Sequence, residues 1–425
     1  MKHLRYILTA ALAISLALSA CTASVQNDGT DSAIQPTAQP EEIVEPASDS
    51  NLAYTTGSNG AHIATGYYSL QYNDDWTAYL AYSDYATAQT VALCNQPNCT
   101  HDNESCLAWF EDPYNIPRIA TNGEKLVYYY LGANNIGGSS GEEFSIEASI
   151  EIADLDGGNR QTICSLESNE TLYEGVCINL DTLYVMVTTT ALNSDGTVSV
   201  EQSVIGVDII TGTQEKLWSA KQENGTIYFL VGCLDNCLVI KKIQAQTISE
   251  DNYLEQVKSQ VHTLYLLSPT KHTIEELCSW QQDEALELAS ASNFYLVNAN
   301  NQLCGLKSDG TMTVLAEDEI FSPGENYLEY VDGSSLWLTS TVRPSQSNPA
   351  PLYKVDLNAG TISEVICDGN ISVLGKYNNE LFVEVSPDTS IQNIQQSFLA
   401  MLPENALYSK DLNSILTERQ FAAID

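Results

Sequence analysis

Three cysteines and one histidine lie close together in a single short stretch, Cys94-x4-Cys99-x-His101-x4-Cys106. Thiolate and imidazole groups are the ligands that zinc prefers, and tetrahedral sites of three cysteines and one histidine are well attested. The spacing lacks the tight C-x2-C knuckle of common zinc modules. Three interpretations are open: a structural disulfide, a zinc site, or reduced and buried thiols. All three predict that residues 94–110 form a structured connector, and none predicts an active site.

The other cysteines suggest disulfide chemistry. The chain has 11 cysteines, and setting Cys21 aside leaves an even number, which is typical of disulfides in exported chains. Cys233 and Cys237 flank a three-residue turn, so they are candidates for a disulfide across a hairpin, and Cys99 with Cys106 could close a loop. Their partners do not follow from the sequence.

A serine motif in the chain does not indicate a nucleophile. Gly137-Gly138-Ser139-Ser140-Gly141 matches G-x-S-x-G, but a nucleophile elbow needs a strand before it and a helix after it. This match lies in a loop rich in Gly, Ser and Asn, which we interpret as flexible. Paired carboxylates would be enough for glycosidase chemistry. The sequence has 55 acidic residues but does not show which of them converge.

The charge balance narrows the choice of partners. The chain has 17 basic and 55 acidic residues and a formal net charge of −38. Phosphate binding needs a basic surface, so nucleic acid is excluded as a partner. We interpret the acidic surface as a source of solubility and mutual repulsion.

A repeated strand–turn–strand pattern must position these candidate residues. Leu352–Cys367 (LYKVDLNAGTISEVIC) is one copy, with Asp356 as its anchor. Related copies recur at intervals of roughly 50 residues, which is a period typical of propellers. The anchors of the seven copies are Asp84, Asp154, Asp208, Ser268, Lys307, Asp356 and Asp411.

Each copy is preceded by a second pair of strand-like runs. Tyr, Val, Ile and Leu dominate these runs, and turn residues such as Asn122-Gly123 separate them, as expected for hairpins. The strongest runs are Lys125–Leu131, Thr182–Val187, Cys237–Ile243, Ser335–Thr341 and Glu380–Val385. Two pairs give four strands per unit, which matches a propeller blade.

We therefore predict an all-β chain whose residues 53–425 form a single β-propeller of seven four-stranded blades. Stacking blades around an axis buries their faces and leaves few exposed edges. Tandem β-sandwiches are the alternative. Long insertions fall between the second and third strands, and we expect them to form a binding face. These insertions are 132–146, 190–202, 244–261 and 386–404.

Two segments carry a resemblance to known proteins. Asp154–Arg160 (DLDGGNR) resembles the turn of TolB-like propeller repeats. The run Leu80–Asp84, followed by Leu93–His101 and Cys106–Trp109, is similar to a group of anchored bacterial lipoproteins with propeller-type domains. The resemblance implies a propeller over about residues 62–420. It implies no catalytic residue, since propellers support many functions.

The first residues read as a targeting segment. Residues 1–20 have a short basic region and an apolar run too short for a stable membrane span. Leu18-Ser19-Ala20-Cys21 resembles the lipobox of bacterial lipoproteins, which implies cleavage before Cys21 and diacylglycerol on its sulfur. Residues 21–52 would then be the lipidated cysteine and a flexible, disordered linker. The expected location is the cell membrane, on its extracytoplasmic face.

These observations favour a binding or scaffold module, and not an enzyme. We expect the loop-rich face of the propeller to bind a protein, peptide or glycan, while the lipid holds the chain at the membrane. The alternative is a carbohydrate-active hydrolase or lyase with carboxylates at the central channel.

Overall fold

The computed structural model describes residues 52–404 and Phe421, apart from several internal gaps. Cys21, Gly137–Gly141, Cys367 and Asp411 lie outside the described residues, so the predictions for them stand as predictions. The gaps are 58–59, 73–76, 95, 97, 112–114, 135–144, 224, 245–259, 282–286, 291–292, 323–325, 341–350, 366–369 and 387–397.

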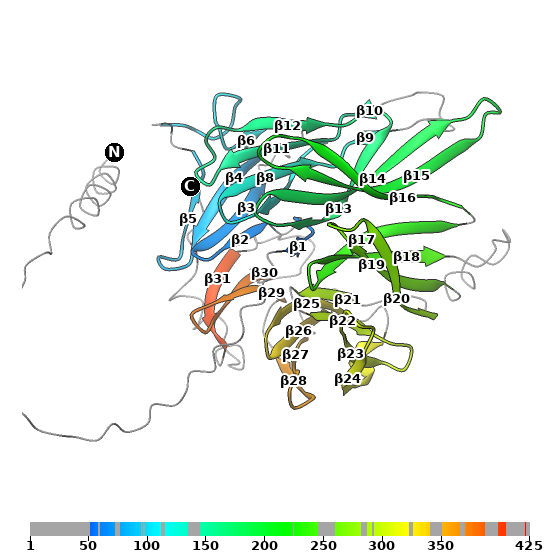
Figure 1. Cartoon of the computed structure of the whole chain (residues 1–425). Helices are drawn as coiled ribbons and strands as arrows, with labels where there is room; N and C mark the ends of the chain where they lie inside the picture. Colours follow the sequence, from blue (N-terminus) through cyan, green and yellow to red (C-terminus); the bar gives the residue numbers. More distant parts are fainter. Residues whose placement is uncertain are drawn as a thin grey trace, which may run out of the picture. The chain divides into compact units, whose positions relative to one another are not determined.

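Seven antiparallel sheets surround a common axis, so the chain is all-β and forms a seven-bladed β-propeller, as the sequence predicts (Figure 1). The tandem-sandwich alternative is thereby wrong. From the axis outward, blade one contains β2 (Ala61–Ile63), β3 (Gly66–Tyr72), β4 (Ala78–Asp84) and β5 (Gln89–Ala92). Blade two contains β7 (Arg118–Thr121), β8 (Lys125–Tyr130), β11 (Ser149–Asp154) and β12 (Gln161–Ser165). Blade three contains β1 (Ala53–Thr55), β13 (Glu170–Ile178), β14 (Thr182–Leu192), β15 (Val198–Asp208) and β16 (Gln214–Lys221).

The remaining blades follow the same order from the axis outward. Blade four contains β17 (Thr226–Leu234), β18 (Cys237–Gln244), β19 (Val261–Ser268) and β20 (Thr273–Gln281). Blade five contains β21 (Glu287–Ser290), β22 (Asn293–Val297), β23 (Gln302–Leu306) and β24 (Met312–Glu317). Blade six contains β25 (Asn326–Asp332), β26 (Ser335–Ser340), β27 (Leu352–Asp356) and β28 (Thr361–Val365), and blade seven contains β29 (Asn370–Tyr377), β30 (Glu380–Ser386) and β31 (Phe398–Pro403). Outside this series lie β6 (Trp109–Phe110), β9 (Ala133–Asn134), β10 (Ser145–Ile146) and the 3-10 helix η1 (Glu319–Phe321).

In blades one to six the repeat anchors mark the same point: they end the third strand or follow it directly, as Asp208 ends β15 and Asp356 ends β27. Blade seven differs from the prediction, because its third strand β31 ends at Pro403, within the predicted insertion 386–404 and before Asp411. The Asp356 carboxylate accepts hydrogen bonds of 2.9 Å from the backbone N–H groups of Asn358 and Ala359. An aspartate that binds the backbone ahead of it closes a turn, which explains why this residue type recurs there.

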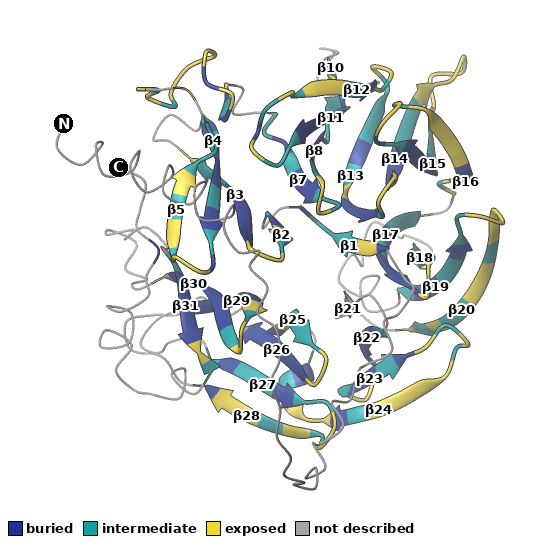
Figure 2. Ribbon diagram, turned by 60° about the vertical axis from the view of Figure 1, so that its left-hand side comes forward, coloured by how far each residue is buried: buried dark blue, intermediate teal, exposed yellow. Residues whose placement is uncertain are grey.

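Apolar strand residues form the core between neighbouring blades. Trp337, Tyr128 and Phe294 are among the largest side chains that are fully buried. Figure 2 shows that buried residues concentrate in the middle strands of the blades, such as β8 and β22, while the outermost strands such as β5, β20, β24 and β28 carry exposed residues. Each fully buried Leu, Val or Phe side chain contributes about 1.5–3 kcal/mol to stability, so stacked blades stabilise one another.

The ring closes through aromatic packing between blade seven and blade one. The ring centroid of Phe382 on β30 lies 5.1 Å from those of Tyr67 and Tyr85 and 5.5 Å from that of Phe421. His62 Nδ1 lies 2.6 Å from the Tyr85 hydroxyl in the same seam, and burial lowers the pKa of His62 to about 4. In the part of the chain that the structure describes, no N-terminal strand joins blade seven. Strand β1 instead pairs with β13 of blade three.

Chain direction divides the connections between two faces of the propeller. Because strands of a blade run antiparallel, the second and fourth strands end on one face and the first and third on the other. We call the first of these the loop-bearing face. It carries the connections from second to third strand, where the sequence predicts the long insertions, and the connections from one blade to the next.

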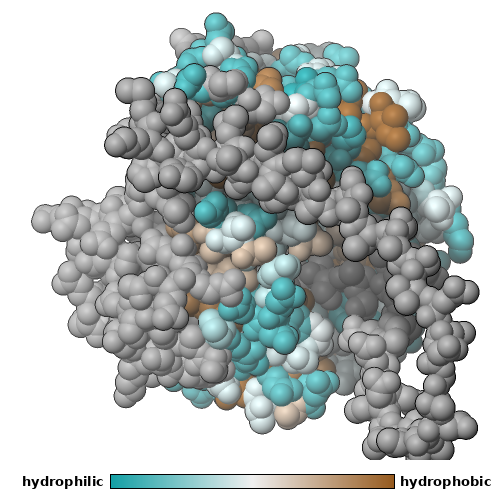
Figure 3. All heavy atoms as spheres, turned by 90° about the vertical axis from the view of Figure 1, so that its left-hand side faces the viewer, coloured by the Kyte–Doolittle hydropathy of each residue, from teal (hydrophilic) through white to brown (hydrophobic). Residues whose placement is uncertain are grey.

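The exterior is in keeping with the acidic composition. On the side drawn in Figure 3, hydrophilic residues predominate among the described ones, and apolar residues form small areas between them. The described residues include no helix with the length and apolar character needed to cross a membrane.

Candidate metal centre

A long connector joins blade one to blade two on the loop-bearing face. It comprises residues 93–117 and returns to blade one, where β6 pairs with the beginning of β4 in the register Ala78 with Phe110. The backbone N–H of Leu93 donates to Leu80, and the N–H of Leu80 donates to Ala108, both at 2.8 Å. The two ends of the connector's first half are therefore held by the same strand, which brings its polar residues together.

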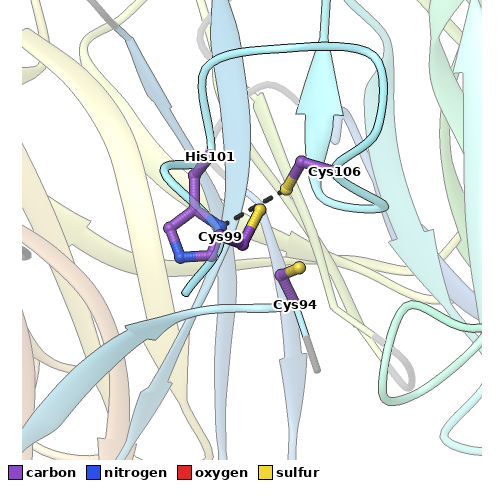
Figure 4. Close-up of side chains that lie close together, drawn as sticks. All are labelled: Cys94, Cys99, His101 and Cys106. Carbon is purple, nitrogen blue, oxygen red and sulfur yellow. Dashed lines mark hydrogen bonds between the residues drawn. The ribbon is translucent and has the colours of Figure 1, made fainter. Parts of the chain in front are cut away.

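Cys94, Cys99, His101 and Cys106, the four residues that the sequence singles out, converge within this connector. We call them the Cys–His cluster. Their ligand atoms all lie within 4.8 Å of one another, and His101 Nδ1 lies 3.3 Å from Cys106 Sγ (Figure 4). Cys106 is buried and the other three are half-buried. Sulfurs bound to one zinc ion at about 2.3 Å would be about 3.8 Å apart in a tetrahedron, so the cluster has suitable dimensions.

The backbone of the loop is bent to bring the imidazole to the thiols. His101 has a φ of 58° and Asn98 a φ of 60°, both in the left-handed region. Asparagine and, less often, histidine are enriched there among non-glycine residues. The His101 ring stacks on Tyr79 of β4, with centroids 6.3 Å apart and planes inclined by 30°. This contact orients the ring toward the sulfurs.

Hydrogen bonds favour a thiolate at one end of the cluster. Burial acts to raise the pKa of Cys94, but hydrogen bonds from the backbone of Gln96 and from the Cys106 and Cys99 thiols lower it below its ordinary value. Burial raises the pKa of Cys106 to about 12. Cys94 is thus the first of the two to ionise, and a cation beside it would favour ionisation of the others.

The cysteines elsewhere correct one prediction. Asp235 and Asn236 have φ values of 47° and 63°, so the turn has two residues and Leu234 pairs with Cys237. Cys233 pairs with Leu238 and therefore points to the other face of the hairpin. The predicted Cys233–Cys237 disulfide does not form in the structure, where both thiols are free. The predicted three-residue turn between these cysteines is wrong, because the turn has only two residues.

The structure instead pairs Cys233 with a cysteine of the preceding blade. Cys177 on β13 and Cys233 on β17 are both fully buried, and the two thiols lie close enough to affect each other's ionisation. Cys177 Sγ lies 3.2 Å from the Gly232 carbonyl oxygen, and Cys233 Sγ lies 3.3 Å from that of Leu52. Burial holds the pKa of Cys177 well above its usual range, which makes this thiol unreactive. Aligning the first strands of successive blades could have placed the two cysteines together.

A buried carboxylate bears on the expectation of hydrolase or lyase chemistry. Glu329 on β25 accepts hydrogen bonds from the Thr339 hydroxyl and, at 3.0 Å, from the backbone N–H of Val373 on β29. Burial, with the charge of Glu384 as a smaller cause, raises its pKa. The bond from Val373 joins blade seven to blade six, whereas the bond from Thr339 lies within blade six. The role that they define is structural, so Glu329 does not favour the enzymatic alternative.

Replacing Glu329 by glutamine should alter how stability depends on pH. Because the folded carboxyl has a raised pKa, the folded chain binds more protons than the unfolded chain between the two pKa values. Its contribution is complete below the unfolded pKa and is lost as pH rises through the folded one. The ordinary pKa of a glutamate is 4.5. Between pH 4.5 and about pH 7, the unfolding free energy of Glu329→Gln should therefore fall less than that of the parent chain. Denaturant titrations at both pH values measure this, and parallel pH profiles would contradict it.

The fold defines the chain as a β-propeller protein. It aligns with the crystal structure of a puromycin hydrolase mutant complexed with PGG over 90% of this chain, with a TM-score of 0.52 and 9% identity. The chain spans a little over half of that structure, 57% of its length. It also aligns with the β-propeller domain of the Trilobed protease from Pyrococcus furiosus, over 80% of this chain and 92% of that domain, with a TM-score of 0.44 and 9% identity.

The sequence comparisons add no closer relationship. No family model matches the chain, and no curated protein matches its sequence. At 9% identity, the likeness to puromycin hydrolase shows the propeller fold alone, and its activity does not follow for this chain.

Proposed function

We propose that this chain is a lipid-anchored, extracytoplasmic binding module whose loop-bearing face meets a protein, peptide or glycan. The lipobox-like residues up to Cys21 support the anchor, and the composition of residues 22–52 supports a flexible tether. Diacylglycerol on Cys21 would hold the propeller at the membrane, and the tether would keep it off the surface.

The observation that carries the proposal is the face at which the described chain enters the propeller. Strand β1 pairs antiparallel with β13, and its first residue, Ala53, lies opposite Ile178 at the end of β13. First strands end on the face opposite the loop-bearing one. A tether that precedes Ala53 would join the propeller opposite its loops, which would leave the loop-bearing face free to point away from the membrane.

A hairpin on the loop-bearing face supplies a contact element. Strands β14 and β15 have 11 residues each, and their pairing continues to Leu192 opposite Val198. The pairing with β13 stops at Thr189, so the tip extends beyond that neighbour (Figure 1). Leu192 is 51% exposed and Val198 44% exposed. Paired apolar side chains at an extended tip are suited to burial against a partner.

Site-specific photocrosslinking in intact cells tests the proposal. A photoreactive amino acid at position 192 should form a discrete adduct. The same group at Val314, which is 52% exposed on the outer strand β24, is the matched control and should form none. The Cys21→Ser variant should move from the membrane to the soluble fraction. Equal labelling from positions 192 and 314, or membrane retention of Cys21→Ser, would overturn the corresponding part of the proposal.

A further inference from the structure

We propose that the Cys–His cluster binds one zinc ion in a closed, structural site that fixes the connector on the loop-bearing face. The ligand set would be the sulfurs of Cys94, Cys99 and Cys106 and the Nδ1 atom of His101. The inference does not depend on which partner the loop-bearing face meets.

The convergence of all four side chains is the first argument. A disulfide would require only two sulfurs to approach, and would leave the third sulfur and the imidazole without a reason to join them. In the structure every ligand atom lies within 4.8 Å of every other, although the four residues span positions 94 to 106. All three cysteines of the cluster are free thiols. A shared central ion accounts for this arrangement, whereas one disulfide does not.

The groups around the cluster provide the second argument. Backbone N–H groups of Gln96 and Leu107 donate to Cys94 Sγ, and that of Ala108 donates to Cys106 Sγ. Backbone donors aimed at sulfur stabilise and orient metal-bound thiolates. The left-handed backbone at His101 and the stacking of its ring on Tyr79 direct Nδ1 toward the sulfurs. The ligands are thus held by their surroundings, as a metal site requires.

The donor set selects the ion. Three thiolates and one imidazole are soft ligands, which favour zinc over calcium or magnesium, since the latter two prefer oxygen. Four protein ligands complete a tetrahedron and leave no open position, so the site is structural and not catalytic. Its effect would be to lock the connector, including β6, against the beginning of β4.

Metal analysis of matched variants tests the proposal. The mature chain, residues 21–425 without an affinity tag and with Cys21→Ser, is purified under reducing conditions without chelator. Elemental analysis should find one zinc per chain, and Cys99→Ser should lose it. His101→Asn should retain zinc at least tenfold more weakly against a competing chelator. Asparagine tolerates the left-handed backbone of position 101, so this variant removes the imidazole with little strain. Cys278→Ser on the outer strand β20 removes a cysteine remote from the cluster and should keep the zinc.

Two further measurements keep the result interpretable if a variant folds poorly. Cobalt added to the metal-free parent chain should produce the visible bands of tetrahedral coordination and the near-ultraviolet absorption of sulfur ligands. Thiol reagents should react with the cluster only after chelation, without any need for reductant. The proposal is overturned if the parent chain holds no zinc and its cluster thiols become reactive only after reduction. It is also overturned if neither Cys99→Ser nor His101→Asn changes zinc retention.

Discussion

Replacing Cys106 by serine is expected to open the connector to proteolysis while the propeller stays folded. Cys106 is the buried ligand of the proposed centre, and structural zinc contributes about 10–16 kcal/mol of binding free energy in small domains. Without the ion, the segment Leu107–Phe110 would lose the constraint that holds Trp109 and Phe110 paired with β4. Chymotrypsin should then cut this segment about tenfold faster or more, since local opening governs cleavage. Mass spectrometry of the fragments identifies the cut.

Chelation of the parent chain is the control, because it removes the metal without placing a serine hydroxyl in the buried position of Cys106. A chelator should give the parent chain the same new cleavage site, and should change nothing further in Cys106→Ser. Cys278→Ser should keep the parent pattern. If the chelator leaves the parent's cleavage rate unchanged, the connector is held by something other than a metal.

Replacing Phe382 by alanine should destabilise the propeller by about 3–5 kcal/mol, the usual cost of deleting a buried phenylalanine ring. Phe382 is fully buried and packs against Tyr67, Tyr85 and Phe421, which together close the ring between blades seven and one. Denaturant unfolding measures the loss. Hydrogen exchange should then rise first in β3 and β30, the strands on either side of this seam.

Phe294→Ala is the matched comparison, because Phe294 is equally buried but belongs to the core of blades four and five. It should cost a similar free energy, yet raise exchange in β22 and its neighbours. Identical exchange patterns for the two variants would show that the seam between blades seven and one does not open independently of the other blade interfaces.

The strands could be predicted from the sequence because their signals are local. The Asp356 turn depends on backbone N–H groups two and three residues ahead, so each copy of the repeat can be recognised from a few neighbouring residues. Runs such as Lys125–Leu131 carry the β-branched and aromatic residues of half-buried strands, and β8 spans Lys125–Tyr130. Because this local signal recurs, the number of blades could be predicted from the number of copies.

Features that depend on distant pairing could not be predicted. Tyr54 pairs with Cys177, and nothing in the short β1 segment indicates a partner so far along the chain. The aromatic seam around Phe382 joins the two ends of the propeller. Such contacts follow from how the ring closes, which local patterns do not determine.

For the candidate site, the sequence supplied the residues but not the choice among three chemistries. The spacing from Cys94 to Cys106 allows a disulfide, a metal or buried thiols. The return of the connector to β4 gathers all three sulfurs and the imidazole, and this convergence supports the metal site that we propose.

X-ray absorption at the zinc edge of the mature chain is the most direct test of this centre. Bound zinc should show three sulfur neighbours at about 2.3 Å and one nitrogen neighbour at about 2.0–2.1 Å. In His101→Asn, the imidazole signature should disappear from whatever zinc is retained. A chain without zinc, or a first shell of oxygen and nitrogen alone, would contradict the Cys–His metal centre.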